Sequence, residues 1–335
     1  MRLRRFRRGR LSVTVPRMPT ICIGNIQAGG TGKTPLVAWA LDSLHLAGLT
    51  PALVARGVGR TTNGLIVRQA GVSGTPDPLV LGDEVAMLVS ERPWLAAAVA
   101  ERRADAVQAL AELPTPLQLA IMDDGFSHLA LARDLDVLCV DCGSPPWTML
   151  PAGRLREPLR SLRRAGCFVL NRGDSTYSDA WQAALDRFAP HKPRFTVKME
   201  PTALVDVNSG NRVPAADFAG KKVLAVSGIA HPRNFERSLL SLGMEPIPRS
   251  FGDHHRYQSC DMAEISRLAE LHGCAAIITT AKDAVKWLAF NPTFPVPALI
   301  LQITTRFDPP SDETALLSLL THAYEEGCKR LASAL

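Results

Sequence analysis

Residues 24–35 carry the side chains best suited to chemistry, in the order Gly-Asn-Ile-Gln-Ala-Gly-Gly-Thr-Gly-Lys-Thr-Pro. Glycines let the backbone curl so that several N–H groups point at one anion, and a following helix adds the positive end of its dipole. Lys33 can reach the β- and γ-phosphates of a nucleotide, and the Thr34 hydroxyl can bind Mg²⁺. Pro35 suits the start of a helix. The segment therefore predicts a phosphate-binding loop.

This loop departs from the standard pattern at two positions. Gln27 stands where the pattern has its first glycine, and Ala28 replaces the extra lysine of the membrane-associated "deviant" P-loop ATPases. The flanking segments support the assignment, because residues 20–23 predict a strand before the loop and residues 36–47 a helix after it. The alternative is a glycine-rich turn that binds no ligand.

A second acidic feature complements the loop. The apolar run 117–122 predicts a buried strand that ends at Asp123 and Asp124. A carboxylate at such a strand end supplies an oxygen ligand to Mg²⁺, directly or through water. The alternative is an aspartate that caps a helix or turn. The position downstream of a P-loop favours the metal site.

Other candidates have plainer alternatives. Asp83 opens a helix, where an acid is ordinary, and Arg56 follows a predicted strand in a Gly-Arg turn that could deliver a cation to the loop. His254 and His255 are adjacent and therefore point in different directions, so acid–base assistance from a loop is favoured over metal binding. The segment at 280–283 lacks the Asn-Lys-x-Asp guanine-binding motif, which leaves adenine as the expected base.

Residues 150–164 hold five arginines and one glutamate. Pro158 predicts a helix start, after which Arg160, Arg163 and Arg164 would share one face at i, i+3, i+4 spacing. Such a face could bind an anionic substrate or lipid headgroup, or it could be solvated. Glu157 could form an ion pair or lie near metal and nucleotide.

Composition indicates a globular protein with a basic N-terminal arm. The chain has 335 residues, 46% of them hydrophobic, and a net charge of +6. Six arginines within residues 2–10 supply this excess, which excludes a broadly basic nucleic-acid-binding protein. The arm suits an anionic membrane surface, or it is a solvated tail. No apolar run reaches membrane-spanning length. The seven cysteines are scattered, and one lone Cys-x-x-Cys at 139–142 argues against zinc.

The order of predicted elements indicates an α/β fold. Strands and helices alternate, as in a P-loop NTPase-type, mostly parallel sheet with helices on both faces, followed by a second, smaller α/β domain. Prolines and a weakened pattern mark a break between them. We expect a basic arm at 1–12, a P-loop kinase domain at 13–193, a hinge at 194–222 and a closing domain at 223–335.

Taken together, these motifs resemble the tetraacyldisaccharide 4'-kinase family, the lipid A 4'-kinases. The matching segments span about residues 20–290. They are Gly24-Asn25 with 29–35, 56–59, 82–84, 123–126 with His128, 151–153 with 155–159, 171–172, Phe251 with 253–255, and 279–280 with 282–283.

The resemblance implies an ATP-dependent kinase. It would transfer the γ-phosphate to the 4'-hydroxyl of a tetraacyldisaccharide 1-phosphate, an acylated glucosamine disaccharide lipid, and form lipid IVA at the cytoplasmic face of the inner membrane. The chain would be peripheral there, without a transmembrane helix. Nucleic acid is not an expected partner.

The resemblance also implies roles for single residues. Asp83 would accept the sugar hydroxyl proton with help from His254 or His255, and Lys33 would act on the phosphates as a catalytic residue. Thr34, Asp123, Asp124 and Glu157 would lie at Mg²⁺. ATP would be held by Gly29, Gly30, Thr31, Gly32, Lys33, Thr34, Pro35, Arg56 and Arg156.

Two features depart from the family. The sequence begins at the basic stretch, where relatives usually have an apolar anchor first, and Ser127 replaces a common glutamine. We expect the serine to weaken positioning without abolishing activity. Two other functions stay open: a membrane-surface P-loop ATPase that switches conformation without a lipid acceptor, and a catalytically silent nucleotide- or lipid-binding protein.

Overall fold

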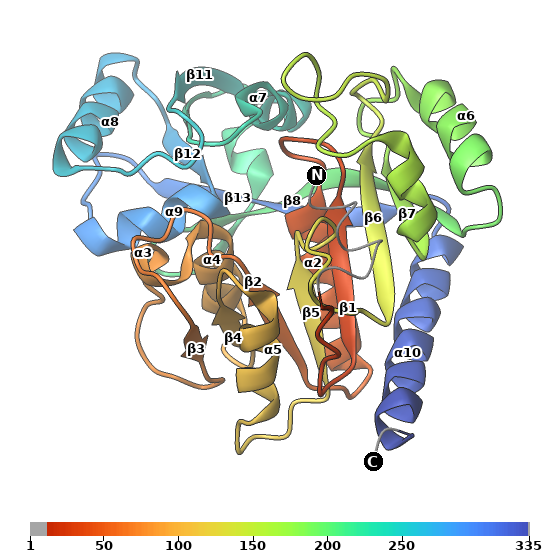
Figure 1. The fold of residues 1–335 in the computed structure, drawn as a ribbon. Coiled ribbons are helices and arrows are strands. Elements are labelled where there is room, and N and C mark those ends of the chain that lie inside the picture. Colours follow the sequence, from red (N-terminus) through yellow and green to blue (C-terminus); the bar gives the residue numbers. More distant parts are fainter. Residues whose placement is uncertain (1–11, 334–335) are drawn as a thin grey trace.

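The computed structural model describes residues 12–333 (Figure 1). The predicted basic arm at 1–12 therefore lies outside the described residues except for Ser12. The strands are β1 Thr20–Asn25, β2 Pro51–Ala55, β3 Ile66–Arg68, β4 Ala96–Val99, β5 Leu119–Asp123, β6 Leu135–Asp141, β7 Cys167–Asn171, β8 Arg194–Asp206, β9 Arg212–Val213, β10 Lys222–Ser227, β11 Glu245–Ser250, β12 Ala276–Thr280 and β13 Ala298–Phe307. The α-helices are α2 Lys33–Leu46, α3 Pro78–Leu81, α4 Asp83–Glu91, α5 Arg103–Ala111, α6 Ser178–Phe188, α7 Pro232–Ser241, α8 Ser259–Leu271, α9 Ala281–Trp287 and α10 Ser311–Ala332. Short 3₁₀ helices are η1 Leu159–Arg164, η2 Ala215–Phe218 and η3 Leu288–Phe290.

The N-terminal part of the sheet is parallel and buried on both faces. Its strands lie in the order β7-β6-β1-β5-β2-β4, and the short β3 pairs antiparallel at the edge. Successive β1 residues point to opposite faces, so Ile21 and Ile23 join a core with α2 and α4, whereas Cys22 joins a core with α5 and α6. This burial explains why β1, β2 and β5 are continuous apolar runs. The predicted α/β fold with helices on both faces is confirmed (Figure 1).

The C-terminal part continues the same sheet. Strands β12, β10 and β11 are parallel to β13, which pairs antiparallel with the 13-residue strand β8. The expected hinge at 194–222 thus begins with a long paired strand. Helix α10 lies against the N-terminal part, where Arg330 Nε donates to Asp134 Oδ1 at 2.8 Å. The division into domains stays a prediction. Strand β8 and helix α10 both connect the N-terminal and C-terminal parts.

Two local predictions differ from the structure. Residues 159–164 form a 3₁₀ helix with three residues per turn, so Arg160 and Arg163 are exposed together while Arg164 turns inward. Strand β11 was not predicted, because Pro246 and Pro248 argue against a strand; it lies at the edge of the sheet, where proline is tolerated. Within residues 12–333, no helix has the length and apolar character needed to cross a membrane.

Candidate active site

The glycine loop follows β1 and ends at the first residue of α2. Gly29 and Gly32 have φ angles of 94° and 85°, a region that L-residues with side chains rarely adopt. Gln27 is buried, and its amide binds the backbone at the end of β6: Nε2 donates to Asp141 O at 3.0 Å, and Asp141 N donates to Oε1 at 2.8 Å. The departure at Gln27 therefore anchors the loop to a neighbouring strand. Across the loop, Asn25 Nδ2 at the end of β1 donates to Thr31 Oγ1 at 2.9 Å.

Lys33 and Arg156 converge on Asp124. The Lys33 Nζ lies 3.9 Å from Asp124 Oδ1, and the Arg156 guanidinium donates to both Asp124 oxygens at 2.9 and 3.1 Å. Arg156 Nε also donates to Gln27 O at 3.2 Å. Burial alone would raise the pKa of Asp124, but Lys33 and Arg156 outweigh it and lower this pKa. Asp124 thus holds two cations beside the glycine loop.

Asp123 has the opposite electrostatic character. Burial raises its pKa to about 7, against the attraction of Lys33, and the charges of Asp124 and Glu84 add to the rise. Its Oδ1 is buried and accepts no hydrogen bond from residues 12–333. A carboxylate oxygen without a donor, next to a phosphate loop, fits a cation. Mg²⁺ commonly takes only one or two protein carboxylates together with substrate phosphates, so Asp123 and the Thr34 hydroxyl at the start of α2 suit it.

Glu157 lies in a separate contact group. Arg164 Nη1 donates to its Oε2 at 2.9 Å, and the Ser127 hydroxyl donates to its Oε1 at 2.6 Å. Burial raises the pKa of Glu157, but these two partners lower it overall. The Arg164 guanidinium also lies 4.2 Å over the Phe126 ring. The described residues contain no group of three or more His, Cys, Asp and Glu side chains that could hold a metal, so Glu157 does not complete such a group with the two aspartates.

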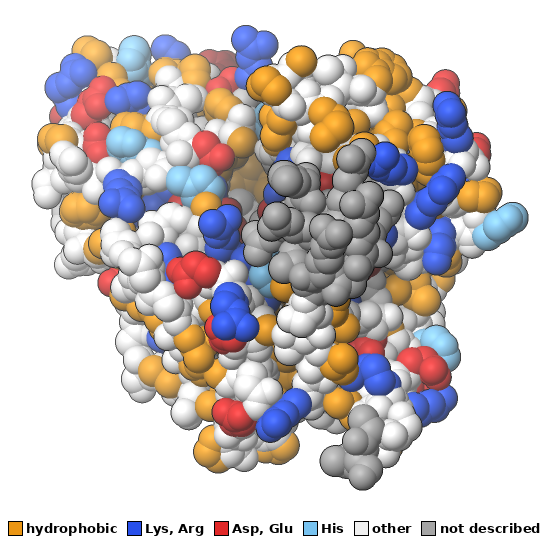
Figure 2. Space-filling model, in the orientation of Figure 1, with side chains coloured by type: hydrophobic (Ala, Val, Ile, Leu, Met, Phe, Trp, Pro, Cys, Tyr) orange, Lys and Arg blue, Asp and Glu red, His pale blue; other side chains and the backbone are white. Residues whose placement is uncertain are grey.

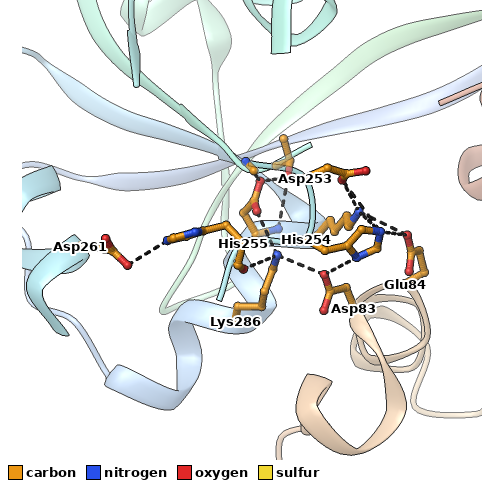
Figure 3. A network of polar contacts seen from close by, with 11 residues as sticks. Asp83, Glu84, Asp253, His254, His255, Asp261 and Lys286 are labelled. Atoms are coloured by element: carbon orange, nitrogen blue, oxygen red, sulfur yellow. Dashed lines mark hydrogen bonds and ion pairs between the residues drawn. The ribbon is translucent and has the colours of Figure 1, made fainter. Parts of the chain in front are cut away.

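Asp83 is the centre of a buried polar network (Figure 3). Its side chain is 6% exposed, and its Oδ2 lies 3.0 Å from His254 Nδ1 and 3.2 Å from Lys286 Nζ. Burial would raise the pKa of Asp83, but His254 and Lys286 lower it overall. The hydrogen bond that Asp83 accepts from His254 in turn raises the pKa of His254, against burial and the nearby Lys282. The structure therefore holds an ionised carboxylate against the Lys286 ammonium and the His254 imidazole.

The two histidines have different partners. His254 adopts a φ of 59°, and its Nε2 lies 3.2 Å from Lys282 Nζ. His255 Nε2 instead lies 3.0 Å from Asp261 Oδ2, at the start of α8 (Figure 3). Only His254 of the pair contacts Asp83, so the structure distinguishes two residues that the sequence left equivalent.

Two distant segments assemble this network. Helix α4 carries Asp83 and Glu84 at its first turn and packs against α9. Helix α9 supplies Lys286, and also Lys282, whose Nζ lies 3.4 Å from Glu84 Oε1 and 3.1 Å from Asp253 Oδ1. Sequence reasoning missed Lys286. The available signal was its spacing: Lys286 lies four residues after Lys282, so both lysines lie on one face of a helix that follows a strand.

A further arginine, Arg103, lies near Arg56 and the two aspartates. Arg103, the first residue of α5, is buried; burial lowers its pKa, the charge of Arg56 adds to this, and Asp124 and Asp123 oppose it. The order β1-β5-β2 explains the grouping, since the glycine loop, the Asp123-Asp124 pair and Arg56 follow the carboxyl ends of three adjacent parallel strands. Arg103 carries no sequence motif and was not predicted.

The arrangement can bind a polyphosphate and accept a proton nearby. Cations converge on the glycine loop, a buried carboxylate oxygen is available to a metal, and a second carboxylate lies on an adjoining helix. The charge of Glu84 acts on Asp123, so the Asp83 network lies within electrostatic reach of the P-loop group. These are the parts required for phosphoryl transfer to a hydroxyl.

Known proteins share this fold and sequence. The family model described as tetraacyldisaccharide-1-P 4'-kinase (LpxK) matches residues 1–321. A tetraacyldisaccharide 4'-kinase of Chlorobium limicola is 36% identical over 306 residues, which cover 87% of this chain and 84% of that protein. The protein of the same name from Pseudomonas putida is 34% identical over 289 residues, covering 85% and 79%. A crystal structure of LpxK from Aquifex aeolicus in complex with ATP superposes with a TM-score of 0.73 at 26% identity, covering 96% of this chain and 94% of that one.

Proposed function

This chain belongs to the tetraacyldisaccharide-1-P 4'-kinase family and is a tetraacyldisaccharide 4'-kinase of lipid A biosynthesis; from this premise we propose how its own residues carry the reaction. The single observation on which the proposal rests is the pairing of a P-loop with a buried, cation-held Asp83. A nucleotide switch needs the first feature, whereas transfer to an alcohol also needs a group that takes the hydroxyl proton.

ATP would bind with its phosphates in the loop formed by Gly29, Gly30, Thr31 and Gly32, at the N-terminus of α2. Lys33, Arg56 and Arg156 would neutralise phosphate charge, and Pro35 supports the start of the helix. The contacts of Lys33 and Arg156 with Asp124 support this, because they hold both cations beside the loop. Positioning and charge neutralisation are the main demands of phosphoryl transfer.

We assign Mg²⁺ to Thr34 and Asp123, with Asp124 beside them. The buried Asp123 Oδ1, which accepts no hydrogen bond within the described part of the chain, supports this assignment. When bound, the ion would neutralise charge that develops on the transferring phosphate. Glu157 would act indirectly, because its oxygens are engaged by Arg164 and Ser127. Ser127 would help to keep Glu157 in place through its hydrogen bond, and the weakened positioning expected from the serine stays a prediction.

Asp83 would accept the proton of the 4'-hydroxyl. A lowered pKa keeps its carboxylate ionised at neutral pH, and the His254 contact at 3.0 Å orients it. His255 would act only by shaping the loop, through its contact with Asp261. Closure of the C-terminal part over the P-loop would exclude water, which competes as the acceptor.

We also propose that the enzyme works at the cytoplasmic face of the inner membrane. The loop after β6 exposes Trp147, Met149 and Leu150, the first of these to 61%. Exposed Arg160 and Arg163 follow on η1. Figure 2 shows hydrophobic side chains gathered near α6 with Lys and Arg beside them. Apolar and basic groups together suit an anionic lipid surface, where an acylated substrate would be found.

The experiment is transfer of label from γ-³²P-ATP with Mg²⁺ to detergent-dispersed tetraacyldisaccharide 1-phosphate, with Lys33→Ala as the control. Labelled lipid that disappears in the control supports the proposal. Free phosphate without labelled lipid would instead indicate an ATPase switch. Labelled lipid that persists in the Lys33→Ala variant would contradict the phosphate-loop assignment.

A further inference from the structure

Arg154 and His231 meet beside the glycine loop, although 77 positions separate them in the chain. Arg154 lies in the segment between β6 and η1, and His231 immediately precedes α7 in the C-terminal part. The Arg154 Nη2 is 2.8 Å from His231 Nε2. Neither residue belongs to the phosphate, metal or proton-accepting groups assigned above.

Arg154 is bound to the loop through both its backbone and its side chain. Its carbonyl oxygen accepts from Ala28 N at 2.7 Å, and its Nε donates to Ala28 O at 3.0 Å. Its Nη1 donates to Ser144 Oγ and lies 3.5 Å from Asp141 Oδ2. The guanidinium is thus fixed on three sides, and His231 supplies the fourth contact.

The pair lies directly against the loop glycines. A Cβ atom added at Gly29 would collide with Arg154 Nη2 and fall 3.0 Å from His231 Nε2. A Cβ at Gly30 would lie 3.4 Å from His231 Cδ2. Any displacement of His231 therefore removes a surface against which the phosphate-binding backbone is packed.

The chemistry of the contact fixes the protonation of the histidine. A guanidinium can only donate, so the Nε2 of His231 must accept and the ring must be neutral with its proton on Nδ1. Protonation would remove the acceptor and place two cations in contact. Burial and Arg154 lower the pKa of His231, while Asp141 and Asp253, the acidic groups that act on it, raise it to a smaller extent.

We propose that His231 is a positioning residue for ATP binding: by accepting from Arg154 it ties the start of α7 to the phosphate loop and holds Ala28–Gly30 in their binding shape. The proposal rests on the assignment of this loop to ATP. It predicts that ATP affinity falls when His231 is protonated, and that the C-terminal part of the chain senses the state of the loop through this contact.

The test is the dissociation constant of ATP for the full chain, measured by isothermal titration calorimetry, together with KM for ATP and kcat in lipid phosphorylation. The variants are His231→Ala, which removes the acceptor, and His231→Gln, whose amide oxygen can accept but does not titrate. His322→Ala is the matched control, because this histidine is 63% exposed on α10. Measurements are made at about pH 8 and about pH 5.5, on either side of the imidazole range.

At the higher pH we expect His231→Ala to weaken ATP binding about tenfold, the effect of losing one hydrogen bond to a charged group, with kcat little changed. His231→Gln should bind ATP nearly as the unmodified protein does. At the lower pH the unmodified protein should lose affinity relative to His231→Gln. Protonation of ATP itself affects both proteins alike and cancels in this ratio.

Equal dissociation constants for all variants at both pH values would overturn the inference, even with lipid phosphorylation intact. A fall in kcat alone, with unchanged ATP affinity, would overturn it as well. Conversely, a His231-dependent ATP affinity in a protein that labels no lipid would support this inference and contradict the proposed lipid kinase reaction. The two proposals can therefore fail separately.

Discussion

Replacing Lys286 with methionine tests the buried network around Asp83. Lys286 Nζ lies 3.2 Å from Asp83 Oδ2 and 3.3 Å from Asp283 Oδ1. The three side chains are 7%, 6% and 0% exposed. Methionine fills a similar volume without the charge. The Lys286→Met variant therefore leaves two nearly buried carboxylates without their shared cation.

The expected loss of stability follows from what these carboxylates retain. Removing one partner of a buried ion pair costs about 3–5 kcal/mol. Asp83 keeps His254 at 3.0 Å, and Asp283 still accepts from Gly228 N at 2.9 Å and Thr280 Oγ1 at 2.7 Å. We therefore expect the Lys286→Met variant to lose about 3 kcal/mol of its free energy of unfolding, the lower end of that range. This is a large part of a typical free energy of unfolding of about 5–15 kcal/mol.

The pH dependence gives the sign of the effect. The pKa of Asp83 is lowered in the folded protein, so its contribution to stability is present above the pKa of the unfolded chain and is lost as pH falls through the folded value. Without Lys286 that contribution shrinks. The difference in stability between the variant and the unmodified protein should therefore be largest at neutral pH and decrease only below about pH 4, as Asp83 becomes protonated.

Urea unfolding of both proteins, at neutral pH and at about pH 3, below the pKa of about 3.9 of an aspartate in the unfolded chain, measures these quantities. Lys329→Met is the matched control: its exposed ion pair with Glu326 should leave the unfolding midpoint unchanged. Adding Asp283→Asn to Lys286→Met should recover part of the loss, because one unpaired charge is removed. A Lys286→Met protein as stable as the parent, or a loss equal at both pH values, would refute the reasoning.

Two further predictions concern the metal and loop groups. Because burial raises the pKa of Asp123 to about 7, Mg²⁺ binding should displace a proton from its carboxyl group. The affinity for Mg²⁺ should therefore increase about tenfold between about pH 6 and about pH 8, as measured by calorimetric titration. The Asp123→Asn variant should bind Mg²⁺ without this pH dependence. Ser127→Ala should lower the free energy of unfolding by about 1 kcal/mol in thermal unfolding, because Glu157 keeps its ion pair with Arg164. Glu157→Ala should lower it more, because Arg164 then loses its carboxylate partner. Equal losses in the last two variants would show that Ser127 and Arg164 do not share one carboxylate.

The sequence predicted the elements whose pattern is local. An apolar run before a glycine loop, and apolar runs that end in acids, were sufficient to place β1 and β5 and the residues at their ends. The same logic failed at β11, where prolines are tolerated only because the strand lies at the sheet edge. It also failed at η1, where a 3₁₀ period replaced the expected α-helical one.

Contacts between distant segments could not be read in this way. Asp83 on α4 and His254 in the loop between β11 and α8 lie 171 positions apart, and the packing of α4 on α9 is a contact between segments far apart in the sequence. Lys286 and Arg103 resemble ordinary helix residues in the sequence and acquire their roles from burial beside carboxylates. No local pattern specified that His254, whose backbone φ is 59°, contacts Asp83 while His255 contacts Asp261.

We propose above all that Asp83 takes the proton of the sugar hydroxyl while the P-loop holds ATP. The most direct test compares Asp83→Asn with the unmodified protein in single-turnover lipid phosphorylation and in equilibrium ATP binding. Asparagine keeps the shape of the side chain but is a far weaker base. We predict a rate of transfer lower by about 10²–10⁴, with the dissociation constant of ATP unchanged. Retained transfer, or an equal loss of ATP binding, would contradict the account.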